Sequence, residues 1–292
     1  MTLRQLEVFV AVARMGNVTR AAAEVGLSQS AASMALAEME KQLGSHLFDR
    51  KGKSLLVNER GRALLPRARE VLSRVKEIEE LFGGGKGGLA GELKIGASST
   101  IGNYLIPEIF GSFVRVYPEP QLSLEVGNTE QIIQEVKSFG VDLGFIEGFC
   151  QDQDIKTIPW RRDQLVVFAS PKHPLAKLKK IAPADLSAAN WILRERGSGT
   201  REVLEAALSE KIPDLNLFLE LGHTEAIKGA VEAGLGISCL SHLTIARAIE
   251  IGTLVALPTP FLNLGRYLSV LIHKQKYQTE TLRTFLHFCQ NI

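Results

Sequence analysis

The chain has 292 residues, of which 45% are hydrophobic and 23% are charged. This length exceeds what one compact core usually supports, so we expect two or three domains. No apolar run approaches the ~18 residues that a membrane span needs, and the N-terminal segment lacks the small-residue cleavage site of a secretory signal. The sequence therefore argues against a membrane-spanning or secreted protein, and we expect no membrane partner and a cytoplasmic location.

The cysteines and histidines predict neither disulfides nor a metal site. Cys150, Cys239 and Cys289 are far apart and odd in number, and the six histidines show no ligand spacing. Cys239, in the apolar run GISCLS, is expected in the core, whereas Cys150, in EGFCQDQ, is expected to be more exposed. Redox sensing by Cys150 is an alternative, and we expect no metal and no cofactor.

Basic side chains concentrate near the N-terminus. The net charge is +2 for the whole chain, but residues 1–90 hold 14 basic and 10 acidic side chains, against 20 and 22 in the rest. From Arg50 to Arg69 the bias is sharper, because seven basic side chains are opposed only by Glu59. A polyanion is the expected partner of this region.

Three short helices are predicted at the start of the chain. Apolar residues at helical spacing predict a first helix that ends near Gly16, and Asn17 is a good N-cap for a second, VTRAAAEV. Gly26 suits the left-handed turn that ends this helix, and Ser28 is the expected N-cap of a third, QSAASMALAEMEKQLG. This order of helices is typical of a helix–turn–helix motif.

The third helix is predicted to contact bases in the major groove of DNA. Ala32, Leu36, Met39 and Leu43 recur at helical spacing and are expected to face the core, which leaves the opposite face at the N-terminal end for DNA. The alternative is an ordinary small helical domain with a solvated basic loop. The predicted DNA-binding residues are Arg20, Ser28, Gln29, Ser30, Ser33, Met34, Arg50 and Lys53.

Two of these residues belong to a predicted β-hairpin. In LFDRKGKSLLVNERG, two short apolar stretches flank the turn signal RKGK, which predicts a hairpin wing with a basic tip. Wings of this kind contact DNA phosphates, and Arg50 and Lys53 are placed to do so.

A long helix is predicted to follow the wing. Asn58 is the expected N-cap of ERGRALLPRAREVLSRVKEIEELF, which continues past Pro66 and ends in the flexible linker GGGKGGLAG. The spacing of its apolar residues alternates between four and three, which is typical of a two-helix coiled coil and predicts self-pairing; an intramolecular partner is the alternative. These apolar residues are Leu64, Ala68, Val71, Val75, Ile78 and Phe82.

The remainder of the chain is predicted to form a two-lobed α/β domain. Short apolar runs alternate with helical ones, which indicates parallel strands covered by helices, with two crossings between the lobes. We divide the chain into a winged helix–turn–helix domain at 1–59, a linker helix and glycine-rich hinge at 60–89, and an effector-binding domain at 90–292. Lobe I is expected at 90–163 and 267–292 and lobe II at 164–266, with a ligand in the cleft between them.

Two turns in this domain match each other. The strand LKIGA leads into Ser98, Ser99 and Thr100, and the strand WILR leads into Ser198, Gly199 and Thr200, each turn before a predicted helix. Free N–H groups at a helix start, together with small hydroxyls, suit an anion, so we expect the two turns to face each other around one. The alternative is that both are plain N-caps.

The N-terminal region resembles a known family. The segment LRQLEVFVAVARMGNVTRAAAEVGLSQSAASMALAEMEKQLGSHLFDRKGKSLLVNERGRALL resembles the DNA-binding domain of LysR-type transcriptional regulators. Where the family usually has a proline and an arginine in the third helix, this chain has Ser30 and Met34. The resemblance implies promoter DNA and RNA polymerase as partners, and a homodimer or homotetramer assembled through the linker helices and the effector domains.

The C-terminal region resembles the same family. The segments ASSTIGNYLIPEI, DLGFIEG, RERGSGTRE and LGISCLS are similar to its sulfur-related, sulfite-responsive branch, whose effector domain resembles periplasmic binding proteins. The resemblance implies sulfite as the effector and a role in sulfur metabolism, with Ser98, Thr100 and Ser198 matching the hydroxyls around the anion. Sulfate, acetylserine and other small anions are alternatives, although Ile101 stands where the sulfate-binding and acetylserine-binding members have a glutamine.

Glu147, at the end of the predicted strand DLGFIE, is expected to face the cleft. A carboxylate disfavours a bare dianion but accepts a hydrogen bond from a protonated oxyanion such as bisulfite. This argument favours sulfite over sulfate. A structural ion pair of Glu147 with Arg196 or Arg201 is the alternative.

The sequence thus predicts an all-α winged helix–turn–helix with a linker helix, followed by a two-lobed α/β effector domain like that of periplasmic binding proteins. The predicted function is regulation of transcription by sequence-specific DNA binding, under control of a small oxyanion. The predicted effector-binding residues are Ser98, Ser99, Thr100, Glu147, Ser198 and Thr200. A solute-binding protein is a less favoured alternative, and an enzyme using Ser198 or Cys150 is disfavoured because no base lies at usable spacing.

Overall fold

A computed structural model describes residues 1–52, 54–82, 89, 91–209 and 215–291. The chain divides close to residue 88 into an N-terminal and a C-terminal unit, and each is described here by itself. No helix among the described residues is long and apolar enough to span a membrane.

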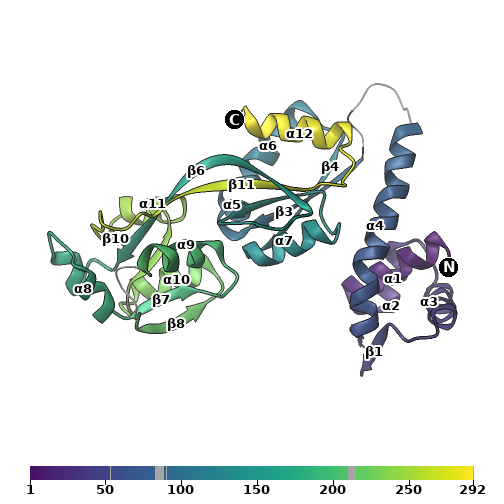
Figure 1. Cartoon of the computed structure of the whole chain (residues 1–292), viewed down its shortest axis with the longest axis horizontal. Coiled ribbons are helices and arrows are strands. Elements are labelled where there is room, and N and C mark those ends of the chain that lie inside the picture. Colours follow the sequence, from purple (N-terminus) through teal and green to yellow (C-terminus); the bar gives the residue numbers. More distant parts are fainter. Residues whose placement is uncertain (53, 83–88, 90, 210–214, 292) are drawn as a thin grey trace. The chain divides into compact units, whose positions relative to one another are not determined.

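The N-terminal unit contains the predicted helices and wing (Figure 1). The predicted caps are confirmed, because the side chains of Asn17, Ser28 and Asn58 accept hydrogen bonds from the backbone N–H groups of Arg20, Ala31 and Gly61. Gly26 has the left-handed backbone (φ 65°) that the turn between the second and third helices requires. The elements are α1 (Leu3–Met15), α2 (Val18–Glu24), α3 (Gln29–Leu43), β1 (Phe48–Lys51), β2 (Ser54–Val57) and α4 (Glu59–Phe82).

The inner face of α3 packs into the core of this unit. Ala32, Leu36 and Met39 are buried as predicted, in the same cluster as Phe9 and Phe48. The expectation that Leu43 faces the core is wrong, since its side chain is 43% exposed. Leu43 is the last residue of α3, and the helix ends at the left-handed Gly44 (φ 63°). The last turn of α3 therefore lies at the margin of the core.

The wing is an antiparallel hairpin of β1 and β2, paired from Phe48 with Val57 to Lys51 with Ser54. The hairpin is fixed to the helices, because the backbone N–H of Leu55 donates to the carbonyl oxygen of Gly16. Arg50 is exposed on β1, whereas the predicted contact Lys53 lies outside the described residues.

Helix α4 uses the first part of its apolar stripe inside its own unit. Leu64 packs against the cluster that buries Ala68. The prediction that the whole stripe pairs with a second helix is therefore wrong for its first half, because α4 crosses α1 there. Farther along, Val71 is 43% and Ile78 57% exposed, which leaves the second half open for a partner.

We expect the double change Val71→Glu and Ile78→Glu to lower the oligomeric state of the full-length protein, because charges would interrupt the exposed half of the stripe. Sedimentation velocity measures this outcome. Ala63→Glu, at an exposed position outside the stripe on the same helix, is the control and should leave the assembly intact. An unchanged sedimentation coefficient in the double variant would show that α4 does not mediate assembly.

The C-terminal unit begins with a parallel group of strands. Strand β3 (Glu92–Ser98) pairs in parallel with β4 (Gln121–Gly127) and with β5 (Leu143–Glu147). The helices of this part are α5 (Ser99–Tyr104), α6 (Ile106–Val116), α7 (Thr129–Lys137) and the C-terminal α12 (Glu280–Gln290). Their core buries Phe113, Phe145 and Phe285.

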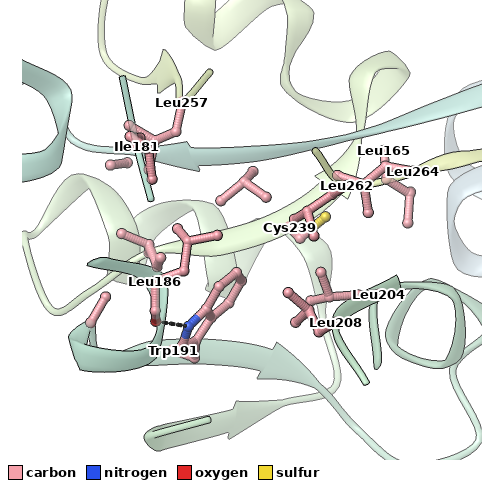
Figure 2. Packing of buried hydrophobic residues seen from close by; sticks show 14 of the residues in the cluster. Leu165, Ile181, Leu186, Trp191, Leu204, Leu208, Cys239, Leu257, Leu262 and Leu264 are labelled. Carbon is pink, nitrogen blue, oxygen red and sulfur yellow. Dashed lines mark hydrogen bonds between the residues drawn. The ribbon is translucent and has the colours of Figure 1, made fainter. Parts of the chain in front are cut away.

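The second lobe has its own core. Its strands are β7 (Trp191–Arg194), β8 (Leu217–Leu221), β9 (Ser238–Ser241) and β10 (Val255–Ala256), and its helices are a short 3-10 helix at Pro174–Lys177, α8 (Pro183–Ala188), α9 (Gly199–Leu208), α10 (Thr224–Glu232) and α11 (His242–Glu250). Trp191 lies in this core, and its indole N–H donates to the carbonyl oxygen of Leu186 at 2.7 Å (Figure 2). Cys239 is buried in the same cluster, as predicted.

Two long strands connect the lobes. Strand β6 (Ile155–Ala169) pairs antiparallel with β11 (Gly265–His273), and both extend across the unit in Figure 1. The expectation of parallel strands is therefore wrong for β6, β9, β10 and β11, which pair antiparallel. The chain crosses between the lobes once in each direction, so the two crossing strands run in opposite senses.

Candidate functional site

The predicted effector residues lie where strands end in the C-terminal unit. Ser98 ends β3, Glu147 ends β5, and Ser198 and Thr200 lie at the start of α9, just after β7. Together with Thr100, these side chains are buried, although all are polar or charged. Buried polar groups of this kind require hydrogen-bond partners.

The Glu147 carboxylate is the centre of the site. One of its oxygens, Oε1, accepts hydrogen bonds from the Ser98 hydroxyl at 3.0 Å and from the Thr100 backbone N–H at 2.8 Å. The other, Oε2, accepts from the Thr200 hydroxyl at 2.9 Å. Donors from both matched turns thus converge on one carboxylate, and Ser98, Thr100, Thr200 and Glu147 are brought together.

Glu147 forms an ion pair with Arg266 on β11, at 3.6 Å from Nη1 to Oε2. The pairings with Arg196 or Arg201 that the sequence left open are not formed; Arg201 pairs with Glu205 and Glu220 instead. Sequence reasoning missed Arg266 because it is more than a hundred residues away and belongs to a strand that crosses between the lobes.

Arg266 itself bridges two buried carboxylates. Its Nη2 lies 2.7 Å from Oδ2 of Asp163 on β6, and its Nη1 donates to the Thr200 hydroxyl at 3.0 Å. The Ser241 hydroxyl donates to the second oxygen of Asp163 at 2.6 Å. The side chains of Arg266 and Asp163 are 3% and 1% exposed, so this network is shielded from water.

The charges determine the ionisation of Glu147. Burial alone would raise the pKa of this carboxyl, but the Arg266 guanidinium and the hydrogen bonds from Thr100 and Thr200 outweigh it and hold the pKa below its ordinary value. Glu147 is therefore a carboxylate at neutral pH.

The backbone around Glu147 is also fixed. Its carbonyl oxygen accepts a hydrogen bond from the Thr129 hydroxyl at 2.7 Å, and that hydroxyl accepts from the Gly199 N–H at 3.2 Å. A Cβ atom at Gly199 would lie 1.8 Å from the same carbonyl oxygen. Only glycine fits this close approach of two main chains.

Ser99 and Tyr104 make further contacts between α5 and the second lobe. The Arg194 guanidinium donates to the Ser99 hydroxyl at 3.2 Å, and the Tyr104 hydroxyl donates to the Glu225 carboxylate on α10. Burial and the contact with Glu225 raise the pKa of Tyr104, so the hydroxyl keeps its proton. The Arg194 side chain is 2% exposed and also pairs with Glu195.

Ser198 lies in a cavity of about 510 Å³ beside the Glu147 site. The cavity is lined by Thr129, Glu130, Ile133, Phe149, Arg196, Gly197, Ser198, Arg201, Glu202 and Glu205. Ser198 is therefore close to the carboxylate site but is not among the groups that bind Glu147. Within the described ranges, no cluster of three histidine, cysteine or acidic side chains could hold a metal ion.

The predicted DNA-binding residues that the structure describes lie at the surface of the N-terminal unit. Gln29, Ser30, Ser33 and Met34 are exposed on α3, on the side opposite its buried residues. Arg20 and Ser28 are exposed on α2 and at the start of α3. Ser28 has a second role, because its hydroxyl caps α3.

We expect Glu147→Gln to weaken the acid sensitivity of the C-terminal unit. The lowered pKa means that the carboxylate stabilises the fold above its unfolded pKa, and that this stability is lost as the pH falls through the folded pKa, below 4.5. At pH 7 the variant should lose about 1.5–3 kcal/mol, the usual worth of hydrogen bonds to a charged group.

Urea unfolding followed by tryptophan fluorescence measures this effect, since both tryptophans, Trp160 and Trp191, lie in the C-terminal unit. Titrations at pH 7, 5 and 3.5 should show a smaller fall in the variant than in the wild type. Superimposable acid profiles would contradict the role given to Glu147.

Two family models match the chain. The model "Bacterial regulatory helix-turn-helix protein, lysR family" matches residues 3–62, and the model "LysR substrate binding domain" matches residues 86–291. The second model alone spans more than half of the chain.

Individual relatives agree with this assignment. The transcriptional regulator YeiE of Escherichia coli K12 is 48% identical over 288 residues, which cover 99% of this chain and 97% of YeiE. The transcriptional regulator CysL of Bacillus subtilis is 32% identical, covering 83% of this chain and 81% of CysL. Full-length CbnR, solved in complex with its target DNA, superposes with a TM-score of 0.69 at 21% identity, covering 100% of this chain and 99% of CbnR.

The resemblance to the LysR-type family is thus confirmed, and YeiE and CysL are among the relatives. The relatives are transcriptional regulators and not enzymes. The chain belongs to the LysR family of bacterial transcriptional regulators and consists of a helix–turn–helix domain that binds DNA and a domain that binds an effector.

Proposed function

We propose that this regulator responds to a small oxyanion, with sulfite as the favoured effector. The observation that carries the proposal is the Glu147 carboxylate, itself an oxyanion, surrounded by hydroxyl, N–H and guanidinium donors. A ligand with two or three oxygens around one atom presents the same acceptors to Ser98, Thr100 and Thr200.

The charge of the site favours a protonated anion over a dianion. Buried Arg266 already pairs with two buried carboxylates, Glu147 and Asp163, and buried Arg194 acts on Glu147 by its charge. Adding a dianion such as sulfate beside the ionised Glu147 would leave uncompensated negative charge in a buried place. Sulfite keeps a proton on part of its molecules at neutral pH, so bisulfite adds one charge less and donates a hydrogen bond to Glu147.

Cysteine oxidation is a weaker alternative. Cys239 and Cys289 are buried, and burial raises the pKa of each thiol to about 12, which leaves little thiolate to react. Cys150 is half-buried and therefore more exposed than Cys239, as expected. It packs against the buried cluster around Ile132.

We propose that the effector changes how a homodimer or homotetramer holds promoter DNA and contacts RNA polymerase in the cytoplasm. The exposed half of the α4 stripe supports one interface. The exposed apolar side chains of the edge strands β4 and β8, Val126 and Phe218, support a second between effector domains.

Thermal unfolding of the full-length protein, followed by tryptophan fluorescence, tests the effector. At a hundredfold excess over its dissociation constant, a ligand should add about 2.7 kcal/mol, a midpoint shift of roughly 5–10 °C. We expect the largest shift with sulfite, and smaller shifts with sulfate, phosphate and acetylserine. If no anion stabilises the protein, the oxyanion proposal fails.

Site variants make this test specific. Ser98→Ala and Ser198→Ala each remove one hydroxyl donor, so sulfite affinity should fall roughly tenfold to a hundredfold. Glu147→Gln should narrow the difference between sulfite and sulfate, because the repelling charge is gone. Unchanged sulfite affinity in both serine variants would contradict this site, and operator binding without sulfite should survive in both.

The DNA contacts predict two different kinds of loss. Gln29→Ala should relax sequence preference, at a cost of ~1–3 kcal/mol for the preferred site only. Arg50→Ala should instead weaken binding to all duplexes alike and flatten its salt dependence. Fluorescence anisotropy with a specific and a scrambled duplex distinguishes these outcomes, and equal losses on both duplexes for Gln29→Ala would contradict base reading by α3.

A further inference from the structure

The exposed face of α3 carries no charge over its first two turns. Its exposed residues there are Gln29, Ser30, Ser33, Met34 and Ala37, and the first charged residue of the helix is Glu38. Basic side chains lie elsewhere in this unit, for example at Arg20 and Arg50. The surface that would meet the bases therefore differs in chemistry from the surface that would meet the phosphates.

Met34 is the most prominent residue of this face. It is 72% exposed, a larger fraction than for Met1, Leu3 or Leu43, the other exposed large apolar residues of α1–α3 and their flanks. Contact with an apolar group that removes this unbranched thioether side chain from water is therefore favourable.

The chemistry of the base edges indicates which apolar group of DNA would cover Met34. In the major groove, guanine is read by arginine or lysine, cytosine by acids, adenine by asparagine or glutamine, and thymine through its C5 methyl group by apolar side chains. The uncharged face of α3 contains no group of the first two kinds. Gln29 suits adenine, and Met34 suits only the thymine methyl.

We propose that Met34 determines operator specificity by an apolar contact with the methyl group of one thymine in each half-site. The inference rests on the proposed docking of α3 in the major groove. Neighbouring Ser30, Ser33 and Ala37 are short, so the longer Met34 side chain extends beyond them and reaches the groove floor first.

Selection from a random duplex library tests the base that is read. The full-length wild type, Met34→Arg and Met34→Leu are each taken through the same rounds of binding and sequencing. We expect the wild type and Met34→Leu to enrich thymine at one position of each half-site, and Met34→Arg to enrich guanine there while all other positions stay unchanged. At an exposed position these changes should leave the melting temperature unaltered.

A second experiment measures the contribution of the thymine methyl group alone. Replacing that thymine by uracil removes only the C5 methyl, so wild-type affinity should fall about fourfold, the worth of one buried methyl group. The same replacement should change the affinity of Met34→Ala by less than half as much. Uracil at a thymine outside the α3 footprint is the matched control.

The outcomes separate the inference from the function on which it rests. If the wild type enriches a sequence but Met34→Arg enriches the same one, or if uracil binds as well as thymine, the methyl contact is refuted while the DNA-binding function stands. If the wild type enriches no sequence at all, both the docking of α3 in the major groove and the methyl contact are contradicted.

Discussion

The C-terminal unit depends on one buried negative charge, the carboxylate of Glu147. Taking an ionised carboxylate out of water is costly unless several donors replace the water. Here the donors come from the β3–α5 turn, from the start of α9 and from β11, so satisfying a single group fixes the positions of three separate segments. The carbonyl oxygen of the same residue ties in the starts of α7 and α9 through Thr129.

This arrangement has a consequence for any effector of the unit. The groups best suited to bind an oxyanion already bind one that is part of the chain, so an effector placed as proposed has to share these donors with Glu147. Under the proposed function, an anion that adds a full second charge beside Glu147, or that cannot donate a hydrogen bond to it, would be disfavoured.

The features that were predictable from the sequence are local ones. Helix caps at Asn17 and Ser28, and the left-handed Gly26, follow from the chemistry of a few adjacent residues, and the structure bears them out. Strand ends beside helix starts also placed Ser98, Thr100 and Thr200 near Glu147, although their predicted roles in ligand and DNA binding stay predictions.

What escaped prediction depends on contacts distant in sequence. Arg266 reaches Glu147 only because an antiparallel strand crosses between the lobes, and no pattern in the neighbouring sequence predicts such a crossing. Likewise, the periodicity of α4 shows an apolar stripe but not which half of it packs against α1. Burial at the end of a helix, as at Leu43, depends on how far the core extends and not on spacing.

The pairing of β6 with β11 limits how the lobes can move. The two strands are in register from Gly265 with Gln164 to His273 with Ile155, with one shift between Leu268 and Ser269. Sliding one strand along the other would break this ladder of hydrogen bonds at once, whereas twisting or bending the ribbon keeps them. A rearrangement of the lobes that keeps this ladder twists or bends the ribbon, and it also keeps Arg266 opposite Asp163, because the two residues are paired across the two strands.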